Sequence, residues 1–183
     1  LSVITESYRD KLHSLIVELE EKTGAEITVV TMPSIAPYDE VAFARKLFDT
    51  WKPGKKGKYN GVLVLLAVKE RRWRIETGYG VEGILPDGLC GDIGRSYMVP
   101  YFKEGKYSEG LYYGVAAIAK IIASDAHVEV TGIQGIPLKK GNSQAPLAMY
   151  IFLPLFFLIW SLPWPIFIGL PFALLFAFAL FGG

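Results

Sequence analysis

The segment G-V-L-V-L-L-A-V at residues 61–68 decides the fold of this chain. It is an unbroken apolar run of strand length, which is typical of a central strand with both faces covered. The short polar segment Lys69–Arg72 and the alternating residues of Trp73–Thr77 follow it, so these residues predict the second arm of a hairpin. Residues 26–32 are rich in β-branched side chains and predict a further strand.

Apolar residues recur at helical spacing on both sides of these strands. The predicted helices cover residues 5–23, 39–51, 86–100 and 108–123, and the third is interrupted by glycines. Thr5 and Ser108 are the expected N-caps, and Gly24 is the expected C-terminal stop of the first helix. Helices that alternate with three strands indicate an α/β sandwich around a small mixed sheet.

Charged residues are confined to one part of the chain. All of them lie between Glu6 and Lys140, and the 43 residues from Gly141 to Gly183 carry none. This distribution excludes a wholly soluble globule. We predict three parts: a soluble domain at residues 1–124, a linker at 125–146 and a membrane anchor at 147–183.

The apolar C-terminal run is too long for one straight membrane span. A single helix over the 35 residues from 147 to 181 would be about 52 Å long, against roughly 30 Å for the hydrocarbon core of a bilayer. The S-L-P-W-P segment at residues 161–165 is a natural helix breaker. We therefore predict a transmembrane helical hairpin of two short spans, with the lipid bilayer as a partner; the alternative is a buried helix pair.

Composition narrows the possible partners and cofactors. The net charge is +1 and the basic residues form only local clusters, so no nucleic-acid partner is expected. A single cysteine, Cys90, excludes an intrachain disulfide and a multi-cysteine metal site. Four residues separate Cys90 from Arg95, one fewer than a cysteine-phosphatase loop requires, so we interpret Cys90 as a small core residue.

Gly78, Gly80 and Gly83 spell G-x-G-x-x-G directly after a predicted strand. A dinucleotide site needs a helix that opens at once and belongs to a βαβ unit. Here Pro86 delays the helix, and the preceding strand is a hairpin arm. No nucleotide cofactor is therefore expected, and we interpret the glycines as a tight loop that needs positive φ.

Oxygen-bearing side chains gather around the predicted end of the sheet. They are Asn60, Glu76, Tyr79, Glu82, Asp87 and Asp92. Carboxylates and an amide at strand ends suit a hard cation such as Ca²⁺ or Mg²⁺. The alternative is a set of caps and salt bridges, with Asp87 as an N-cap. Arg71, Arg72 and Arg74 are typical of a solvated sheet edge that is protected against pairing.

Six segments form an ordered set along the chain. They are L-S at residues 1–2, T-G-A-E-I-T-V-V at 23–30, W-K-P-G at 51–54, N-G-V-L-V-L-L-A at 60–67, R-I-E-T-G-Y-G-V-E-G-I-L-P-D at 74–87 and P-Y-F-K-E-G-K-Y at 100–107. This set resembles the TPM domain family over residues 1–124. The resemblance implies a three-layer α/β/α sandwich. By position, Asn60 and Asp87 match the polar site residues of the family, and Tyr79 and Gly80 match its loop.

The resemblance also implies a range of functions. Some relatives are described as acid phosphatases in photosystem II repair, some bind calcium, and others assist or modulate membrane complexes. Bacterial relatives commonly carry a signal peptide, this domain and membrane spans. The soluble domain is therefore expected on the extracytoplasmic side, either in the periplasm or at the cell surface, although Lys139 and Lys140 beside the first span favour the opposite orientation.

Two functions from different classes are therefore predicted. The first is an interaction module that helps to assemble or maintain a membrane protein complex, with Ca²⁺ at Asn60, Glu82 and Asp87 as a candidate ligand. The alternative is a metal-assisted acid phosphatase, in which Arg74, Tyr79 and Gly80 would contribute to ligand binding. These residues include no strong nucleophile or base, which favours the first function.

Overall fold

The computed structural model describes residues 3–133, 135 and 136 of the chain. The elements are α1 (Glu6–Thr23), β1 (Glu26–Met32), α2 (Glu40–Trp51), β2 (Gly61–Ala67), β3 (Arg72–Thr77), α3 (Tyr79–Glu82), α4 (Asp87–Ile93), a π-helical segment (Gly94–Met98), α5 (Val99–Lys103) and α6 (Tyr107–Asp125). Helices and strands are mixed in the first half and helices alone follow, so the fold is α/β as predicted.

β2 is the central strand of a three-stranded sheet with the order β1-β2-β3. β1 pairs with β2 in parallel, from Glu26 opposite Gly61 to Met32 opposite Ala67, and β3 pairs with β2 antiparallel. Every residue of β2 is buried, whereas β1 and β3 are only partly covered. The central strand predicted from its apolar run is therefore confirmed, and the sheet is small and mixed.

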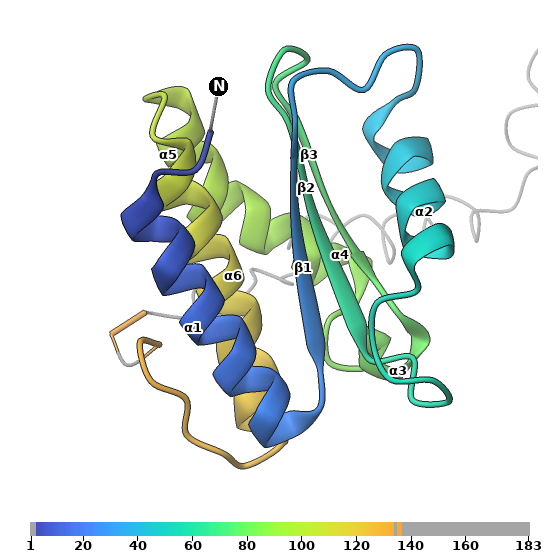
Figure 1. The fold of residues 1–183 in the computed structure, drawn as a ribbon, viewed down its shortest axis with the longest axis vertical. Helices are drawn as coiled ribbons and strands as arrows, with labels where there is room; N and C mark the ends of the chain where they lie inside the picture. The colour runs from blue at the N-terminus through green and yellow to red at the C-terminus, as the bar shows by residue number, and fades with distance from the viewer. Residues whose placement is uncertain (1–2, 134, 137–183) are drawn as a thin grey trace, which may run out of the picture. The chain divides into compact units, whose positions relative to one another are not determined.

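Helices cover both faces of this sheet (Figure 1). On one face, Val64 and Leu66 belong to a large apolar cluster with α1 and α6. On the other face, Leu63 and Leu65 form a small cluster with Ala44 of α2. Because successive side chains of a strand point to opposite faces, the single run of β2 supplies both clusters.

The helix ends agree with the prediction in one case and differ in two. Gly24 ends α1 with φ 74°, and its N–H donates to the Glu20 carbonyl. Thr5 makes no side-chain cap; its N–H donates to Ser108 Oγ at 3.0 Å. Ser108 lies inside α6 rather than capping it, and its hydroxyl donates to the Val3 carbonyl at 3.4 Å. The Ser108 side chain thus ties the start of the chain to α6.

The predicted helix over residues 86–100 is not interrupted by its glycines. α4, the π-helical segment and α5 follow one another without a gap. A Cβ at Gly94 would overlap the indole ring of Trp73, so the missing side chain allows this segment to approach β3 closely. The wider π-helical turn begins at this contact. Gly94 therefore serves close packing rather than helix termination.

The residues that follow α6 pack against the domain, although the prediction places them in the linker. Three of their side chains are buried in the large cluster: Val130, Ile133 and Ile136. Glu18 of α1 accepts hydrogen bonds from the backbone N–H and the hydroxyl of Thr131. Figure 1 shows this segment, in orange, beside α1. Residues 127–131 form turns and irregular backbone.

The predicted membrane anchor at residues 147–183, with its turn at 161–165, lies outside the described residues. Within the part of the chain that the structure describes, no helix is long and apolar enough to cross a bilayer. The transmembrane hairpin stays a prediction.

Candidate functional site

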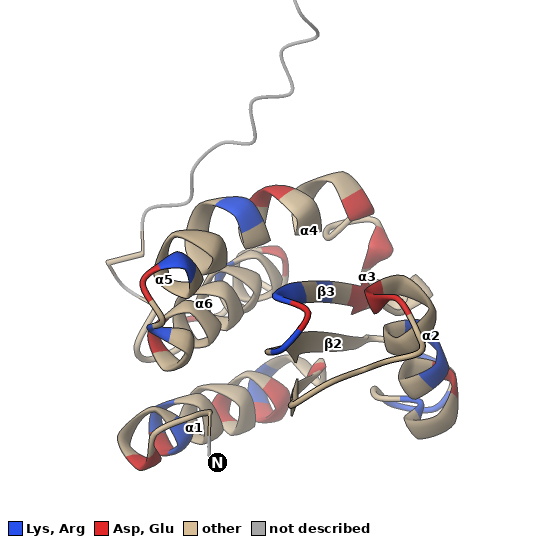
Figure 2. Ribbon diagram, turned by 90° about the horizontal axis from the view of Figure 1, so that it is seen from above, with Lys and Arg blue, Asp and Glu red and all other residues tan. Residues whose placement is uncertain are grey.

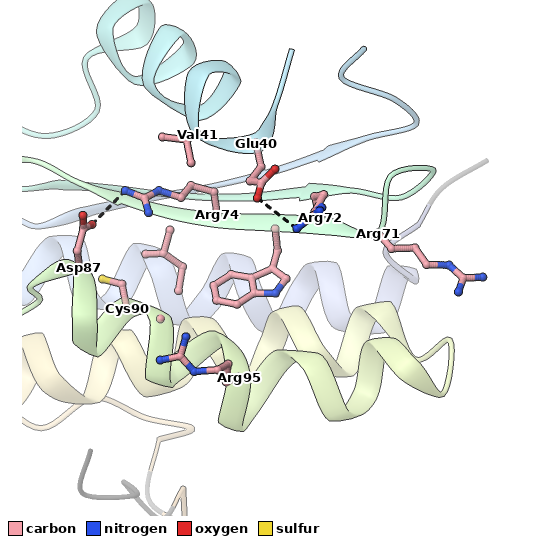
Figure 3. A pocket seen from close by; sticks show the side chains of 11 residues that line it. Glu40, Val41, Arg71, Arg72, Arg74, Asp87, Cys90 and Arg95 are labelled. Carbon is pink, nitrogen blue, oxygen red and sulfur yellow. Dashed lines mark hydrogen bonds and ion pairs between the residues drawn. The ribbon is translucent and has the colours of Figure 1, made fainter. Parts of the chain in front are cut away.

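A cleft of about 380 Å³ lies at the outer edge of β3 (Figure 3). Five consecutive residues, 71–75, line it from the sheet, and its walls come from the start of α2 and from α4 with the π-helical segment. Six lining side chains are charged: Arg71, Arg72, Arg74, Arg95, Glu40 and Asp87. Four arginines and two carboxylates thus line this arginine-lined cleft. Glu76 and Asp92 pair with two of the arginines from beside the cleft, so exposed guanidinium groups, rather than a net positive charge, favour anions here.

The alternation of β3 directs its polar side chains towards α2. Arg72 pairs with Glu40 of α2 at 3.6 Å, and Arg45 of α2 pairs with Glu76 at 3.3 Å. Figure 2 shows basic residues in blue at the start of β3, where the strand leaves the hairpin turn. Charge therefore occupies the α2 side of the β3 edge.

Trp73 and Ile75 alternate with these charged residues of β3 and point away from α2. Ile75 belongs to the large cluster, and Trp73 packs beside it against Gly94 of the π-helical segment. Because Gly94 packs against Trp73, the residue that follows Gly94, Arg95, lies at the wall of the cleft opposite α2 (Figure 3). The cleft therefore extends around the edge of β3, from the charged α2 side to the α4 side.

A chain of ion pairs holds Arg74 at the centre of the cleft. Its guanidinium donates to Glu76 at 3.0 Å and to Asp87 at 3.1 Å, and Glu76 is almost fully buried. Desolvation lowers the pKa of Arg74, but the hydrogen bond and charge of Glu76 and the charge of Asp87 outweigh it, so the pKa is raised. Arg74 is 22 % exposed, so its predicted place on a solvated edge is wrong.

The remaining arginines of the cleft are more accessible. The side chains of Arg72 and Arg95 are 64 % and 65 % exposed. Arg95 pairs with Asp92 at 2.7 Å within its own helical turn. Arg71 is exposed at the hairpin turn and forms no ion pair with another described residue. Because exposed ion pairs are weak, these guanidinium groups can exchange their partners for a ligand at little cost.

The residues predicted to bind Ca²⁺ have other partners. Asn60 is nearly buried; its Oδ1 accepts from the Lys55 N–H at 2.9 Å, and its Nδ2 donates to the Gly24 carbonyl at 2.7 Å. Asp87 pairs with Arg74, and Glu82 is exposed on α3.

Residues 3–133, 135 and 136 contain no group of three or more His, Cys, Asp or Glu side chains that could hold a metal ion. This donor arrangement does not fit Ca²⁺, which prefers six to eight oxygen ligands. Calcium binding at Asn60, Glu82 and Asp87 stays a prediction.

The glycines at residues 78–83 do not form the predicted positive-φ loop. Gly78 and Gly83 flank a helical turn, α3, Gly80 lies within it, and none of the three has positive φ. A Cβ at Gly78 or Gly80 would overlap the carbonyl oxygen of Tyr59 or Lys58, so close backbone approach is the reason for glycine. The contact brings Tyr79, which is 84 % exposed, beside the segment that precedes Asn60.

Cys90 is buried in the wall of the cleft, as its interpretation as a core residue predicted. Burial, followed by the charge of Asp87, raises the pKa of the Cys90 thiol to about 12. The thiol is therefore neutral at physiological pH and is no activated nucleophile.

The cleft itself could not be predicted from the sequence. Glu40 and Arg95 belong to it only because α2 and the π-helical segment pack on opposite sides of β3. The one signal within the sequence was the alternation of Arg72, Arg74 and Glu76, which indicated a charged side of the strand.

A profile of the TPM domain matches residues 2–121. The chain belongs to the TPM domain family. No curated protein matched this chain. This TPM domain contains every strand of the sheet and all residues of the arginine-lined cleft.

Solved structures of similar fold are known from three bacteria. The N-terminal domain of a P. gingivalis protein is 34 % identical, with a TM-score of 0.65, and the match covers 69 % of this chain and 81 % of that one. The BA42 protein of Bizionia argentinensis is 23 % identical, with a TM-score of 0.56, covering 66 % and 82 %. The N-terminal domain of cg2496 from Corynebacterium glutamicum is 17 % identical, with a TM-score of 0.50, covering 67 % and 74 %. The last two likenesses concern the fold alone.

Proposed function

We propose that this TPM domain is the binding module of a membrane-anchored protein and acts on the extracytoplasmic side. Its arginine-lined cleft recognises an acidic segment of a membrane protein complex that it helps to assemble or maintain. The observation that carries this proposal is the pair of exposed guanidinium groups, of Arg72 and Arg95, beside an open cleft of about 380 Å³.

The chemistry of arginine supports binding. A guanidinium presents a planar fork of donors that matches a carboxylate, and it remains charged at every physiological pH. Arg72 and Arg95 stand on opposite walls of the cleft, and both are more than half exposed. Arg74, held by Glu76 and Asp87, is the rigid part between them.

Catalysis has less support among the side chains that line the cleft. The Cys90 thiol has its pKa raised to about 12, so it supplies no thiolate near neutral pH. Arginines can stabilise a phosphoryl group, but turnover also needs an activated nucleophile. The lining residues thus favour recognition over phosphate-ester hydrolysis.

The test uses the 183-residue chain in detergent and a peptide of six glutamates. Binding is measured by isothermal titration calorimetry at two salt concentrations. We expect the double variant Arg72→Gln/Arg95→Gln to bind roughly tenfold more weakly than the wild type, because it loses two charge-assisted contacts. The matched control is Lys56→Gln/Lys58→Gln, which removes the same charge from an exposed loop and should bind like the wild type.

Equal affinity of both double variants would refute the cleft as the recognition site. Hydrolysis of p-nitrophenyl phosphate by the wild type, lost in Asp87→Ala with an unchanged circular dichroism spectrum, would instead make the phosphatase function primary.

A further inference from the structure

Among the residues that the structure describes, the sheet edge beside the arginine-lined cleft has no partner strand. β3 is the last strand in the order β1-β2-β3 of these residues, so within them it pairs with β2 on one side only. The five consecutive residues 71–75 line the cleft from its other side. An edge strand presents a row of backbone N–H and C=O groups that can pair with another extended chain.

The hydrogen-bond pattern of the hairpin identifies which backbone groups face outwards. Val62 lies opposite Thr77, and the Gly78 N–H donates to the Gly61 carbonyl at 2.9 Å. In an antiparallel pair, every second residue exchanges hydrogen bonds with its partner strand. Counting back from Gly78, these residues are Glu76, Arg74 and Arg72. The N–H and C=O groups of Trp73 and Ile75 therefore point away from β2, into the cleft.

The walls of the cleft suit an extended segment. Val41 of α2 presents an exposed apolar side chain on one wall. Gly91 of α4 lies on the opposite wall and has no side chain to project into the cleft. Glu40 and Arg72 stand beside Val41, and Arg95 stands beside Gly91. Alternate side chains of an added strand would point to the two walls, where apolar and basic contacts are both available.

We infer that an extended acidic segment of the partner adds to the sheet as a fourth strand along β3. Its backbone pairs with the outward groups of Trp73 and Ile75. Carboxylates on one face of the added strand pair with Arg72, and carboxylates on its other face pair with Arg95. This mode of binding is β-strand addition, in which the backbone supplies affinity and the side chains supply specificity. The inference rests on the proposed function, because it takes the cleft to be the recognition site.

The arginines of β3 determine which kind of strand can pair with this edge. Two copies of β3 placed edge to edge would bring their arginines together, and like charges opposite each other destabilise a strand pair. Arginines at an edge thus discourage self-association, while a strand with glutamates or aspartates on both of its faces gains from the same charges. An acidic partner segment fits the edge better than a second copy of this chain.

The experiment compares blocked peptides of repeated Glu-Glu-Val-Val, which place glutamates on both faces of an added strand and differ only in backbone methylation. One version is N-methylated at every odd-numbered residue, the other at every even-numbered residue. An added strand uses the N–H of every second residue only. We expect one version to bind the 183-residue chain in detergent at least about tenfold more weakly than the parent peptide, and the other to bind within about twofold of it.

Amide hydrogen exchange provides the matching observation on the protein. Addition of the parent peptide should slow exchange at the amides of Trp73 and Ile75. The amide of Arg74, which is directed at β2, should be unaffected. Arg72→Gln/Arg95→Gln should weaken the parent peptide and the tolerated methylated version by the same factor.

The outcomes separate this inference from the proposed function. If both methylated versions bind like the parent while Arg72→Gln/Arg95→Gln still weakens binding, strand addition is overturned and cleft recognition stands. If no acidic peptide binds, the proposed function itself is refuted. If the amides of Trp73 and Ile75 become protected with rising protein concentration in the absence of peptide, a second copy occupies the edge and the acidic partner is wrong.

Discussion

Leu65 and Leu66 are adjacent in β2 and both are fully buried, yet they enter clusters of very different size. Among the described residues, Leu66 belongs to a cluster of 25 buried side chains, which joins the sheet to α1, α4 and α6. Leu65 belongs to a cluster of four described residues, whose outer neighbours on α2 are only partly buried. The α6 side of the sheet is therefore the structural core, and the α2 side has little apolar packing of its own.

Ion pairs connect α2 to the sheet, whereas apolar contacts hold α6 against it. Arg45 of α2 reaches the buried carboxylate of Glu76, and Arg74 joins the same carboxylate from the strand. Such networks cost desolvation and add less stability than apolar packing of the same volume. The comparison indicates that the large core maintains the fold, which leaves the α2 side and the β3 edge available for binding.

The largest predicted effect tests this division directly. Leu66→Ala should lower the free energy of unfolding by about 3–5 kcal/mol, because a large packed cluster cannot close the cavity. Leu65→Ala should cost about 2–3 kcal/mol, because Phe43 and Phe48 are partly exposed and can move inwards. Urea unfolding of both variants, followed by near-ultraviolet circular dichroism, gives the two values. A larger loss for Leu65→Ala would contradict the division.

The second prediction concerns the segment after α6, which adds buried side chains to the large cluster. A chain cut after residue 124 lacks Val130, Ile133 and Ile136, whereas a chain cut after residue 141 keeps them. The lost burial is partly offset by the chain entropy that the segment regains. We expect the shorter chain to be less stable by about 2 kcal/mol, measured by urea unfolding of both fragments. Equal midpoints would show that the segment adds nothing to the core.

Local patterns predicted most of the fold, because they follow from strand and helix periodicity. β1 has the predicted bounds, and α1, α2, β2, β3 and α6 begin and end within one or two residues of the prediction. The misses have tertiary causes. Gly78 and Gly80 were interpreted as a loop and Gly94 as part of an interrupted helix, but these three admit backbone or an indole ring at close range.

The candidate site was harder to predict for the same reason. Asn60 and Asp87 were selected for their oxygen atoms, and the structure assigns those atoms to Lys55 and Arg74. Which carboxylate meets which arginine depends on packing between elements far apart in sequence. Residue type alone could indicate only that polar groups gather near β3.

Competition between Arg74 and a cation tests the calcium prediction. A Ca²⁺ ion at Asp87 must displace the guanidinium of Arg74, so Arg74→Gln should increase any stabilisation by calcium. With a Kd on the order of 1 mM, 10 mM Ca²⁺ would stabilise the native state by about 1.4 kcal/mol. We expect a smaller gain in the wild type than in Arg74→Gln, measured as thermal shifts with CaCl₂ and with NaCl of equal ionic strength. Equal shifts in the wild type and in Asp87→Asn would remove Asp87 from any calcium site.

The smallest predicted effect concerns the acid stability of the α6 side. The hydrogen bond from Lys22, followed by those from Thr131, holds the pKa of Glu18 below its ordinary value of 4.5. A lowered folded-state pKa stabilises the protein above the ordinary value, and this stability is lost as the pH falls through 4.5 and below. Glu18→Gln should therefore be less stable than the wild type at pH 7 and nearly equal to it at pH 3. Lys22→Gln should reduce the same pH dependence, since it removes the largest cause. The measurement is urea unfolding at pH 7, 5, 4 and 3. If Glu18→Gln kept the full difference at pH 3, the contribution of Glu18 would be packing of its side chain rather than its charge.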